Sequence, residues 1–230
     1  MRAACIVLAA ALAACASPAP PADASGLHIG VVVLHGEGDD PYGRTLRLTR
    51  TLIRDGFLTD SPEMPWSARR AYDTGVSGAM KEIDASAVRL KSRGAKKIFV
   101  AGHGLGAAAA VGYATLRRVD GLIVLAPSSP GPAKAGAGSA RTSARLEGEF
   151  SDAGPLSFGR TAAAVRPGTQ VLWIVGGSEE PGLKKADQAA FEALPRNPPP
   201  QFVVVGGGHM DTPSAAAGLS ADWMREIVKQ

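Results

Sequence analysis

The chain has 230 residues, of which 45% are hydrophobic and 5% aromatic, and this composition fits one compact domain behind a leader. Its formal net charge of +4 rests on scattered basic pairs without interleaved aromatic residues, which argues against nucleic acid as a partner. The only cysteines, Cys5 and Cys15, lie in the leader, so the domain has no thiol for a disulfide, a zinc thiolate site or a nucleophile. The four histidines lack metal-ligand spacing, and we expect neither a metal nor another cofactor.

The first 15 residues resemble a bacterial lipoprotein signal peptide. Arg2 provides a positive charge, and the apolar stretch 3–11 is too short to span a bilayer as a stable helix. A Leu-Ala-Ala-Cys motif then ends at Cys15, which a lipobox would make the lipidated first residue of the mature protein. Ordinary cleavage after Ala16 is the alternative, because an A-x-A signal also ends there.

These two readings of the leader predict different locations. Lipidation predicts a bacterial cell-envelope protein anchored to the membrane through Cys15, on the periplasmic side of the outer membrane. Simple cleavage predicts a soluble periplasmic or secreted protein. Residues 16–27 contain three prolines and are interpreted as a flexible linker that holds the domain away from the membrane. The folded domain is expected over residues 28–230.

From residue 29 onward, short apolar runs alternate with helical patterns, which is typical of a parallel sheet wrapped by helices. Most of these runs are apolar throughout rather than alternating, so we expect strands that are covered on both faces. The predicted fold class is α/β: a three-layer α/β/α sandwich with a mostly parallel sheet of about six strands. The predicted strands are 29–34, 56–59, 97–101, 121–126, 170–175 and 201–205.

The clearest helical pattern lies between the second and third predicted strands. Its apolar residues recur at steps of four and three and form one stripe, which indicates packing against the core, and Gly94 then takes the place of a helix C′ glycine. The stripe consists of Val76, Met80, Ile83, Ala87 and Leu90. Further helices are expected over 45–54, 105–117, 183–194 and 214–228. Residues 127–143 have no periodicity and are interpreted as a long crossing that resembles the remnant of a lid.

Two glycine-rich motifs directly follow predicted strands. Residues 35–38 read H-G-x-G, a loop that can offer a backbone N–H to a developing oxyanion. Gly102, Gly104 and Gly106 form G-x-G-x-G between an apolar strand and an alanine-rich helix. Strand, tight turn and helix is the setting of the nucleophile elbow G-x-S-x-G, but here Gly104 stands at the serine position. The spacing matches neither a P-loop nor a dinucleotide fingerprint.

An acid and a histidine come later in the chain, each shortly after a predicted strand. Glu179 lies three residues after Gly176, with Glu180 as the alternative acid, and His209 follows three consecutive glycines. Elbow, acid and histidine is the chain order of the triad in α/β-hydrolases.

With these motifs, the chain resembles the α/β-hydrolase superfamily over residues 29–228. It is similar to a small member that lacks a large cap domain and the two leading strands of larger members. The resemblance implies that His209 is the catalytic base and that Glu179 orients it.

The resemblance also implies where a ligand would be bound. The backbone N–H groups of Leu105 and of Glu37, or a neighbour, would form an anion-binding hole. His35 and Gly36 would shape the first loop, and His103 would flank the elbow, in structural rather than catalytic roles.

Gly104 is the departure from the family pattern, because it lacks the oxygen that attacks a carbonyl carbon. Ordinary serine-hydrolase turnover is therefore not expected, and whether the chain is an enzyme stays open. Three serines, Ser128, Ser129 and Ser178, lie outside any elbow and are interpreted as turn residues.

Three hypotheses follow for the function. The first is an envelope-tethered hydrolase-like protein without catalysis that binds a small ligand or a protein. The second is a hydrolase or lyase in which the His209 and Glu179 pair activates water or abstracts a proton from an ester or related carbonyl substrate. The third is a variant of an active esterase, since glycine and serine codons can differ by one base, and resequencing of the gene tests it.

Overall fold

The computed structural model describes residues 28–127, 148–150 and 154–229. Within them six strands form one sheet in the order β2-β1-β3-β4-β5-β6, and every neighbouring pair is parallel. The strands are β1 (Ile29–Leu34), β2 (Leu58–Asp60), β3 (Lys97–Gly104), β4 (Gly121–Pro127), β5 (Gln170–Gly176) and β6 (Gln201–Val205).

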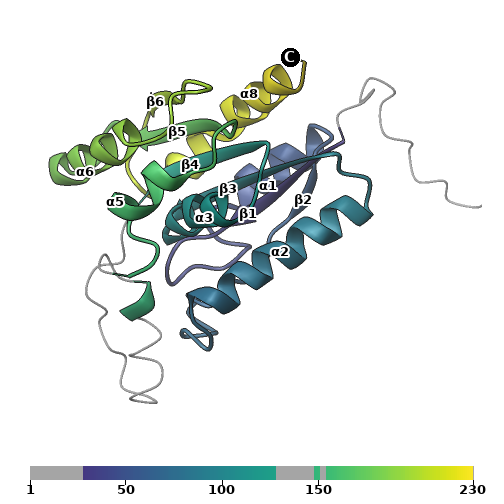
Figure 1. Ribbon diagram of the computed structural model, residues 1–230, viewed down its shortest axis with the longest axis horizontal. Coiled ribbons are helices and arrows are strands. Elements are labelled where there is room, and N and C mark those ends of the chain that lie inside the picture. Colours follow the sequence, from purple (N-terminus) through teal and green to yellow (C-terminus); the bar gives the residue numbers. More distant parts are fainter. Residues whose placement is uncertain (1–27, 128–147, 151–153, 230) are drawn as a thin grey trace, which may run out of the picture.

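Helices cover both faces of the sheet, which gives three layers (Figure 1). One face is covered by α2 (Val76–Ser92), α3 (Leu105–Leu116), α5 (Phe158–Thr161), the 3₁₀ turn η1 (Ala162–Ala164) and α6 (Pro181–Glu192). The other face is covered by α1 (Leu46–Arg54), α7 (Thr212–Ala215) and α8 (Ala217–Lys229). The predicted three-layer α/β/α fold with a parallel sheet of six strands is therefore confirmed.

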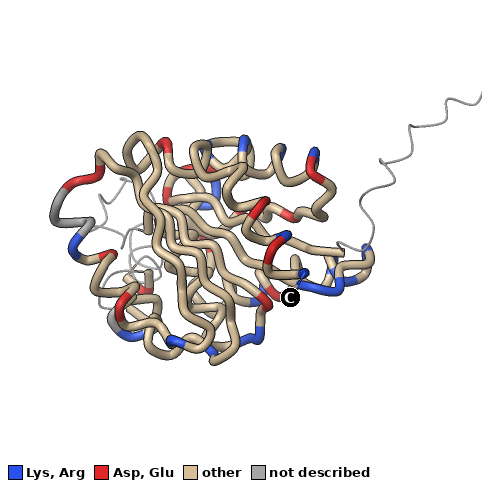
Figure 2. The backbone as a smooth tube through the Cα atoms, turned by 90° about the horizontal axis from the view of Figure 1, so that it is seen from above, with Lys and Arg blue, Asp and Glu red and all other residues tan. Residues whose placement is uncertain are grey.

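The central strands are apolar on both faces because each face meets a helical layer. Val100 and Val124 point toward α2 and α3, whereas Phe99 and Ile123 point toward α1 and α8, and all four are fully buried. Burial of such side chains contributes about 1.5–3 kcal/mol each. Charged residues lie mainly around the outside of the molecule, away from these strands (Figure 2).

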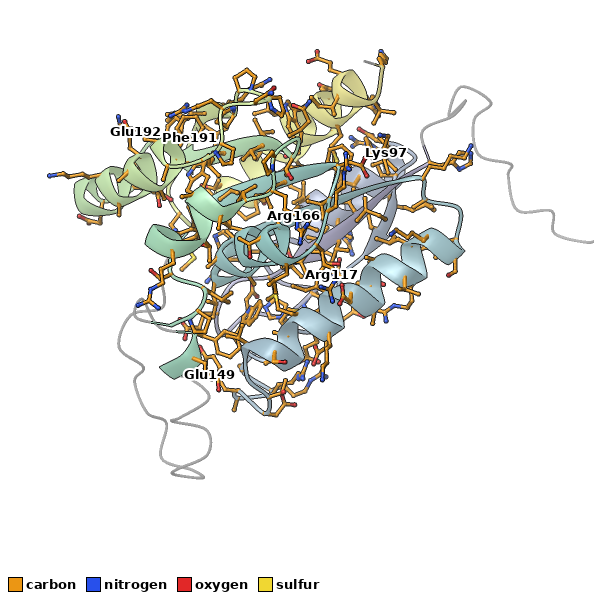
Figure 3. The ribbon with its side chains drawn as sticks, viewed as in Figure 1. Lys97, Arg117, Glu149, Arg166, Phe191 and Glu192 are labelled. Atoms are coloured by element: carbon orange, nitrogen blue, oxygen red, sulfur yellow. The ribbon has the colours of Figure 1, made fainter. Side chains whose placement is uncertain are left out.

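Strand β6 does not fit the prediction of strands covered on both faces. Phe202 and Val204 expose 37% and 59% of their surface, whereas Val203 packs against the core beneath α8. β6 is the edge of the sheet, so only one of its sides has a neighbouring strand. Phe202 nevertheless contacts the ring of Phe191 on α6, with ring centroids 5.1 Å apart, and Figure 3 shows the position of Phe191 on that helix.

The predicted stripe of α2 is buried along its whole length, from Val76 to Leu90. The helix ends where the sequence indicates, because Gly94 adopts φ 100°, a left-handed conformation that favours glycine. On its other side, Asp84 accepts hydrogen bonds from Tyr113 of α3 and from Arg117, which directly follows that helix. Arg117 lies between the two helices in Figure 3, so these bonds tie α2 to α3.

Several boundaries differ from those predicted. The single helix expected over 214–228 is two helices, α7 and α8, separated by a turn at Ala216. Pro181 begins α6 two residues early, at the first helical position, where the absence of its N–H costs no hydrogen bond. β3 extends to Gly104, so the elbow follows the strand without a loop.

Part of the predicted organisation falls outside the described residues. This applies to the signal peptide, Cys15 and the linker at residues 16–27, and to residues 128–143 of the predicted crossing. The leader and the crossing therefore stay predictions. Among the described residues, no helix is both long and apolar enough to cross a membrane.

The strand order creates a switch point between β1 and β3. After β1 the chain crosses through α1 to β2, on one side of the sheet, and after β3 it crosses through α3 to β4, on the opposite side. The loops at the carboxyl ends of these two strands therefore diverge. In parallel α/β sheets ligands bind in the crevice that such divergence opens.

Candidate active site

The elbow between β3 and α3 is built from main chain. Gly104 is the last residue of β3 and the N-cap of α3, with φ 56° and ψ −120°, a conformation that residues with a side chain rarely adopt. A Cβ atom on Gly102 would lie 2.1 Å from the carbonyl oxygen of Gly106. A Cβ atom on Gly106 would lie 2.5 Å from the carbonyl oxygen of His35. The outer glycines are therefore required by close backbone approach, and the sharp turn persists although Gly104 has no side chain.

The loop after β1 is held by the buried side chain of His35. Its Nδ1–H donates to the carbonyl oxygen of Gly36 at 2.8 Å, and its Nε2 accepts from the N–H of Met64 at 3.0 Å. The indole N–H of Trp66 donates to the His35 carbonyl oxygen at 2.8 Å. Burial lowers the pKa of His35, which keeps the ring neutral and both bonds in place. His35 thus orders its loop and does not face a ligand.

Glu179 and His209 lie together at the carboxyl ends of β5 and β6. Oε1 of Glu179 is 3.4 Å from Nδ1 of His209, and the Glu179 side chain is only 1% exposed. Within the described part of the chain, neither carboxylate oxygen of Glu179 makes a hydrogen bond of good geometry. Glu180, the alternative acid, is exposed at the N-cap of α6. Catalytic hydrogen bonds in ligand-free sites are often long, so 3.4 Å is compatible with an orienting contact.

Glycines bring the acid and the histidine together. A Cβ atom on Gly176 would lie 2.8 Å from the carbonyl oxygens of Gly207 and Gly208, so only glycine lets the two loops approach this closely. The N–H of Gly177 donates to the Val205 carbonyl oxygen at 2.8 Å. The loop after β5 is therefore tied to the loop that carries His209.

His103 connects the elbow to the histidine loop. Its Nε2–H donates to the carbonyl oxygen of His209 at 3.0 Å, and the two rings lie 4.7 Å apart between centroids. Burial, assisted by the nearby His209, lowers the pKa of His103 to about 4, so this ring is neutral near pH 7. His103 therefore has a structural role, because it positions the main chain of His209, the candidate base.

The loop after β1, the elbow and the loop that carries His209 enclose a pocket of about 230 Å³. The predicted residues that line it are Gly36, Glu37, His103, Gly104 and His209. Leu105 is fully buried at the start of α3, and the buried Glu179 contacts His209 without lining the pocket. Across the described residues, no group of three or more His, Cys, Asp or Glu side chains is arranged to hold a metal ion.

Three lining residues were missed from the sequence: Asp39, Arg44 and Met210. Met210 directly follows His209 and exposes 54% of its surface, so its position beside the histidine was an available signal. Arg44 begins a series of arginines at steps of three and four, a helical spacing that was also readable. Together these residues make the mouth of the pocket more polar and more charged than the motifs alone indicate.

No protein-family model and no curated protein matches this sequence. Solved structures do match. Est1E from Butyrivibrio proteoclasticus, solved with ferulic acid, is 17% identical, with a TM-score of 0.62 over 87% of this chain and 90% of that one. A dienelactone hydrolase from Anabaena variabilis is 16% identical, with a TM-score of 0.63 over 88% of each chain.

A further match comes from a study of the metagenome-derived lipolytic enzymes LipS and LipT. It is 16% identical, with a TM-score of 0.64 over 88% of this chain and 94% of that one. Likeness at this level of identity shows the fold. The chain therefore has a three-layer α/β-hydrolase-like fold, as the sequence motifs predict.

Proposed function

We propose that this chain binds a small, polar acyl-type ligand in the pocket over Gly104, without the covalent step of serine hydrolases. The observation that carries the proposal is the elbow itself. Gly104 keeps the sharp turn, φ 56° and ψ −120°, between an intact strand and helix, but it has no oxygen to attack a carbonyl carbon. Loss of the triad serine costs about 10⁶ in rate, and binding groups alone retain roughly 10³ to 10⁴ over water.

The pocket supports the choice of ligand class. Its volume of about 230 Å³ suits a small molecule, and Glu37, Asp39 and Arg44 give its wall polar and charged character. At the elbow the ligand's carbonyl oxygen would face the N-terminus of α3, where backbone N–H groups and the helix dipole favour negative charge. The lipobox-like sequence at Cys15 supports the further proposal that the protein is tethered to the bacterial envelope.

A second candidate function is hydrolysis by activated water. It is favoured by one observation: His209 lines the same pocket as Gly104, and the buried carboxylate of Glu179 lies 3.4 Å behind its ring. A water molecule in the place of the serine oxygen would give its proton to His209 and attack an ester carbonyl. Such an enzyme would form no acyl intermediate.

The test compares Gly104→Ser with Gly104→Ala, using release of p-nitrophenol from a short acyl ester. Both variants place a Cβ atom in the same strained turn, so they should lose similar stability, about 1–3 kcal/mol. We expect the wild type and Gly104→Ala to be inactive and Gly104→Ser to gain hydrolysis that His209→Gln abolishes.

The other outcomes of this assay decide between the candidates. Rapid release by the wild type that His209→Gln abolishes would overturn the binding proposal in favour of activated water. If neither the wild type nor a folded Gly104→Ser variant releases p-nitrophenol, the pocket is not arranged for acyl ligands, and both candidates fail.

A further inference from the structure

A second hollow runs along helix α1, beside the pocket. It has a volume of about 580 Å³. Four of its lining residues are arginines, Arg44, Arg47, Arg50 and Arg54, and we call this hollow the arginine groove. Steps of three and four residues place Arg47, Arg50 and Arg54 along one face of the helix, and Arg44 lies in the turn before it. Its remaining lining residues are Gly43, Leu46, Thr51 and Ser214, so no acidic side chain contributes to the wall.

Most of this positive charge is unpaired. Arg54 forms an ion pair with Asp55 at 3.0 Å. The guanidinium groups of Arg44, Arg47 and Arg50 make no hydrogen bond or ion pair with any residue that the structure describes. Asp39 is close, but its carboxylate accepts the main-chain N–H of Arg44 at 3.0 Å rather than the guanidinium.

The arginines do not serve the fold. The core face of α1 is supplied by Leu48 and Leu52, which are fully buried on the opposite side of the helix. Arg47 lies in the first turn of α1, where the helix dipole disfavours a cation. Like charges three residues apart repel one another as well. Arg54 lies in the last turn, where the helix dipole favours a cation, so it is the arginines at the start of the row whose charge an anion would offset.

The groove adjoins the pocket over Gly104. Arg44 lines both hollows, and Ser214, on the far wall of the groove, lies five residues after His209 in the same segment. A ligand that enters the pocket can therefore extend along α1 without leaving the protein surface. Guanidinium groups donate two parallel hydrogen bonds to phosphate oxygens, which makes arginine well suited to a phosphate group.

We propose that the arginine groove binds a phosphate group of the ligand whose other end enters the pocket. The link to the pocket rests on the proposed function, whereas phosphate binding in the groove does not. The phosphate belongs to a soluble phosphate ester or to a phospholipid headgroup, and the two sources present the same chemistry to the arginines.

The experiment measures binding of inorganic pyrophosphate by calorimetry, in the wild type and in the double variant Arg47→Gln/Arg50→Gln. Arg44 is left intact because it lines the pocket. The matched control is Arg118→Gln/Arg160→Gln, which removes the same charge from exposed arginines outside the groove. We expect the groove variant to bind at least about tenfold more weakly and the control to bind like the wild type. Absence of pyrophosphate binding, or equal weakening in both variants, overturns the proposal.

Two further measurements identify the source and the link to the pocket. Sedimentation with phosphatidylcholine vesicles, with and without phosphatidylglycerol, tests the lipid source, and groove-dependent binding to the anionic vesicles assigns the phosphate to a lipid headgroup. Groove-dependent pyrophosphate binding without vesicle binding assigns it to a soluble ester. In the Gly104→Ser variant, pyrophosphate should slow ester hydrolysis. If that variant is inert but pyrophosphate still binds through Arg47 and Arg50, the proposed function fails and the groove stands.

Discussion

The elbow and the acid–histidine arm, which comprises the loops after β5 and β6 and helix α6, are both shaped by close main-chain packing but differ in their buried side chains. The elbow is fixed by main-chain packing, since a Cβ atom on Gly102 would lie 2.1 Å from another backbone atom. Glycines also bring the two loops of the arm together, but its central contact is between side chains, Glu179 to His209, at 3.4 Å. Among the described residues, the buried polar atoms without a hydrogen-bond partner include both oxygens of Glu179 and one oxygen of Asp187 in the arm, and Nδ1 of His103 beside the elbow.

The packing of the elbow and the buried carboxyl groups of the arm affect stability differently. Gly104 adopts the positive φ of the elbow without the steric strain that a side chain would add there. The arm instead holds buried carboxyl groups that lack hydrogen bonds, which destabilises a folded protein. The elbow is therefore closely packed whether or not it has a chemical role, whereas the buried carboxylate oxygens of the arm lower the stability of the fold.

The largest expected effect tests the packing of the elbow. Gly102→Ala would place a Cβ atom 2.1 Å from the Gly106 carbonyl oxygen and 2.4 Å from its carbon, and backbone atoms cannot move away cheaply. We expect the free energy of unfolding in urea to fall by about 4 kcal/mol or more. The matched control is Gly218→Ala in α8, where a Cβ atom meets no other atom within 4 Å. Equal stability of the two variants would contradict main-chain packing as the basis of the elbow.

The next effect tests the arm through Asp187, which lies on α6 and is 4% exposed. Burial, with a contribution from the charge of Glu179, raises the pKa of Asp187 from 3.8 to about 8. Between pH 3.8 and pH 8 the native state keeps a proton on Asp187 that the unfolded chain loses. The contribution of Asp187 to stability is therefore full below pH 3.8 and falls as the pH rises toward 8. We expect a fall of about 3 kcal/mol between pH 5 and pH 8 from this group.

Asp187→Asn should remove most of this fall, because the amide has no proton to lose. Urea denaturation at several pH values measures it, with Asp222→Asn as the control, since the Asp222 side chain is 73% exposed. A wild type and an Asp187→Asn variant that lose stability in parallel as the pH rises would show that Asp187 is not held protonated.

The sequence predicted the elbow from neighbouring residues, whereas it predicted the pairing of Glu179 with His209 only through the family resemblance. Gly102, Gly104 and Gly106 are local, and their spacing between an apolar strand and an alanine-rich helix already specifies a turn. Likewise, the stripe of α2 and the central strands follow from periodicity and apolar runs, which depend on neighbours in the chain.

What the sequence could not predict depends on residues far apart in the chain. The contact of His103 with His209 joins positions 106 residues apart, and it exists only because β6 returns to the edge of the sheet beside β5. In the sequence, Asp187 is one of several polar residues of a helix that also contains apolar ones. Its burial follows from how α6 packs against the sheet. The arginine groove needs Ser214 as its far wall, which no spacing along α1 reveals.

The smallest expected effect concerns His103, which joins the two regions. The pKa of His103 is lowered from 6.5 to about 4. This shift is smaller than that of the Asp187 pKa and has the opposite effect on how stability depends on pH. Between pH 6.5 and pH 4 the unfolded chain binds a proton at His103 that the native state does not bind. The contribution of His103 to stability is therefore full above pH 6.5 and is lost as the pH falls toward 4. Between neutral pH and pH 5 we expect the wild type to lose about 2 kcal/mol through this group.

His103→Gln should flatten that acid limb, because its amide can still donate to the His209 carbonyl oxygen but does not titrate. His28→Gln, at an exposed position, is the control and should keep the wild-type profile. An acid limb that stays equally steep in His103→Gln would place the protonation elsewhere. A flattened acid limb in His103→Gln, together with a flattened alkaline limb in Asp187→Asn, would show that the elbow and the arm titrate as separate units. The pH of greatest stability is then set by the balance between one neutral histidine and one protonated carboxyl group.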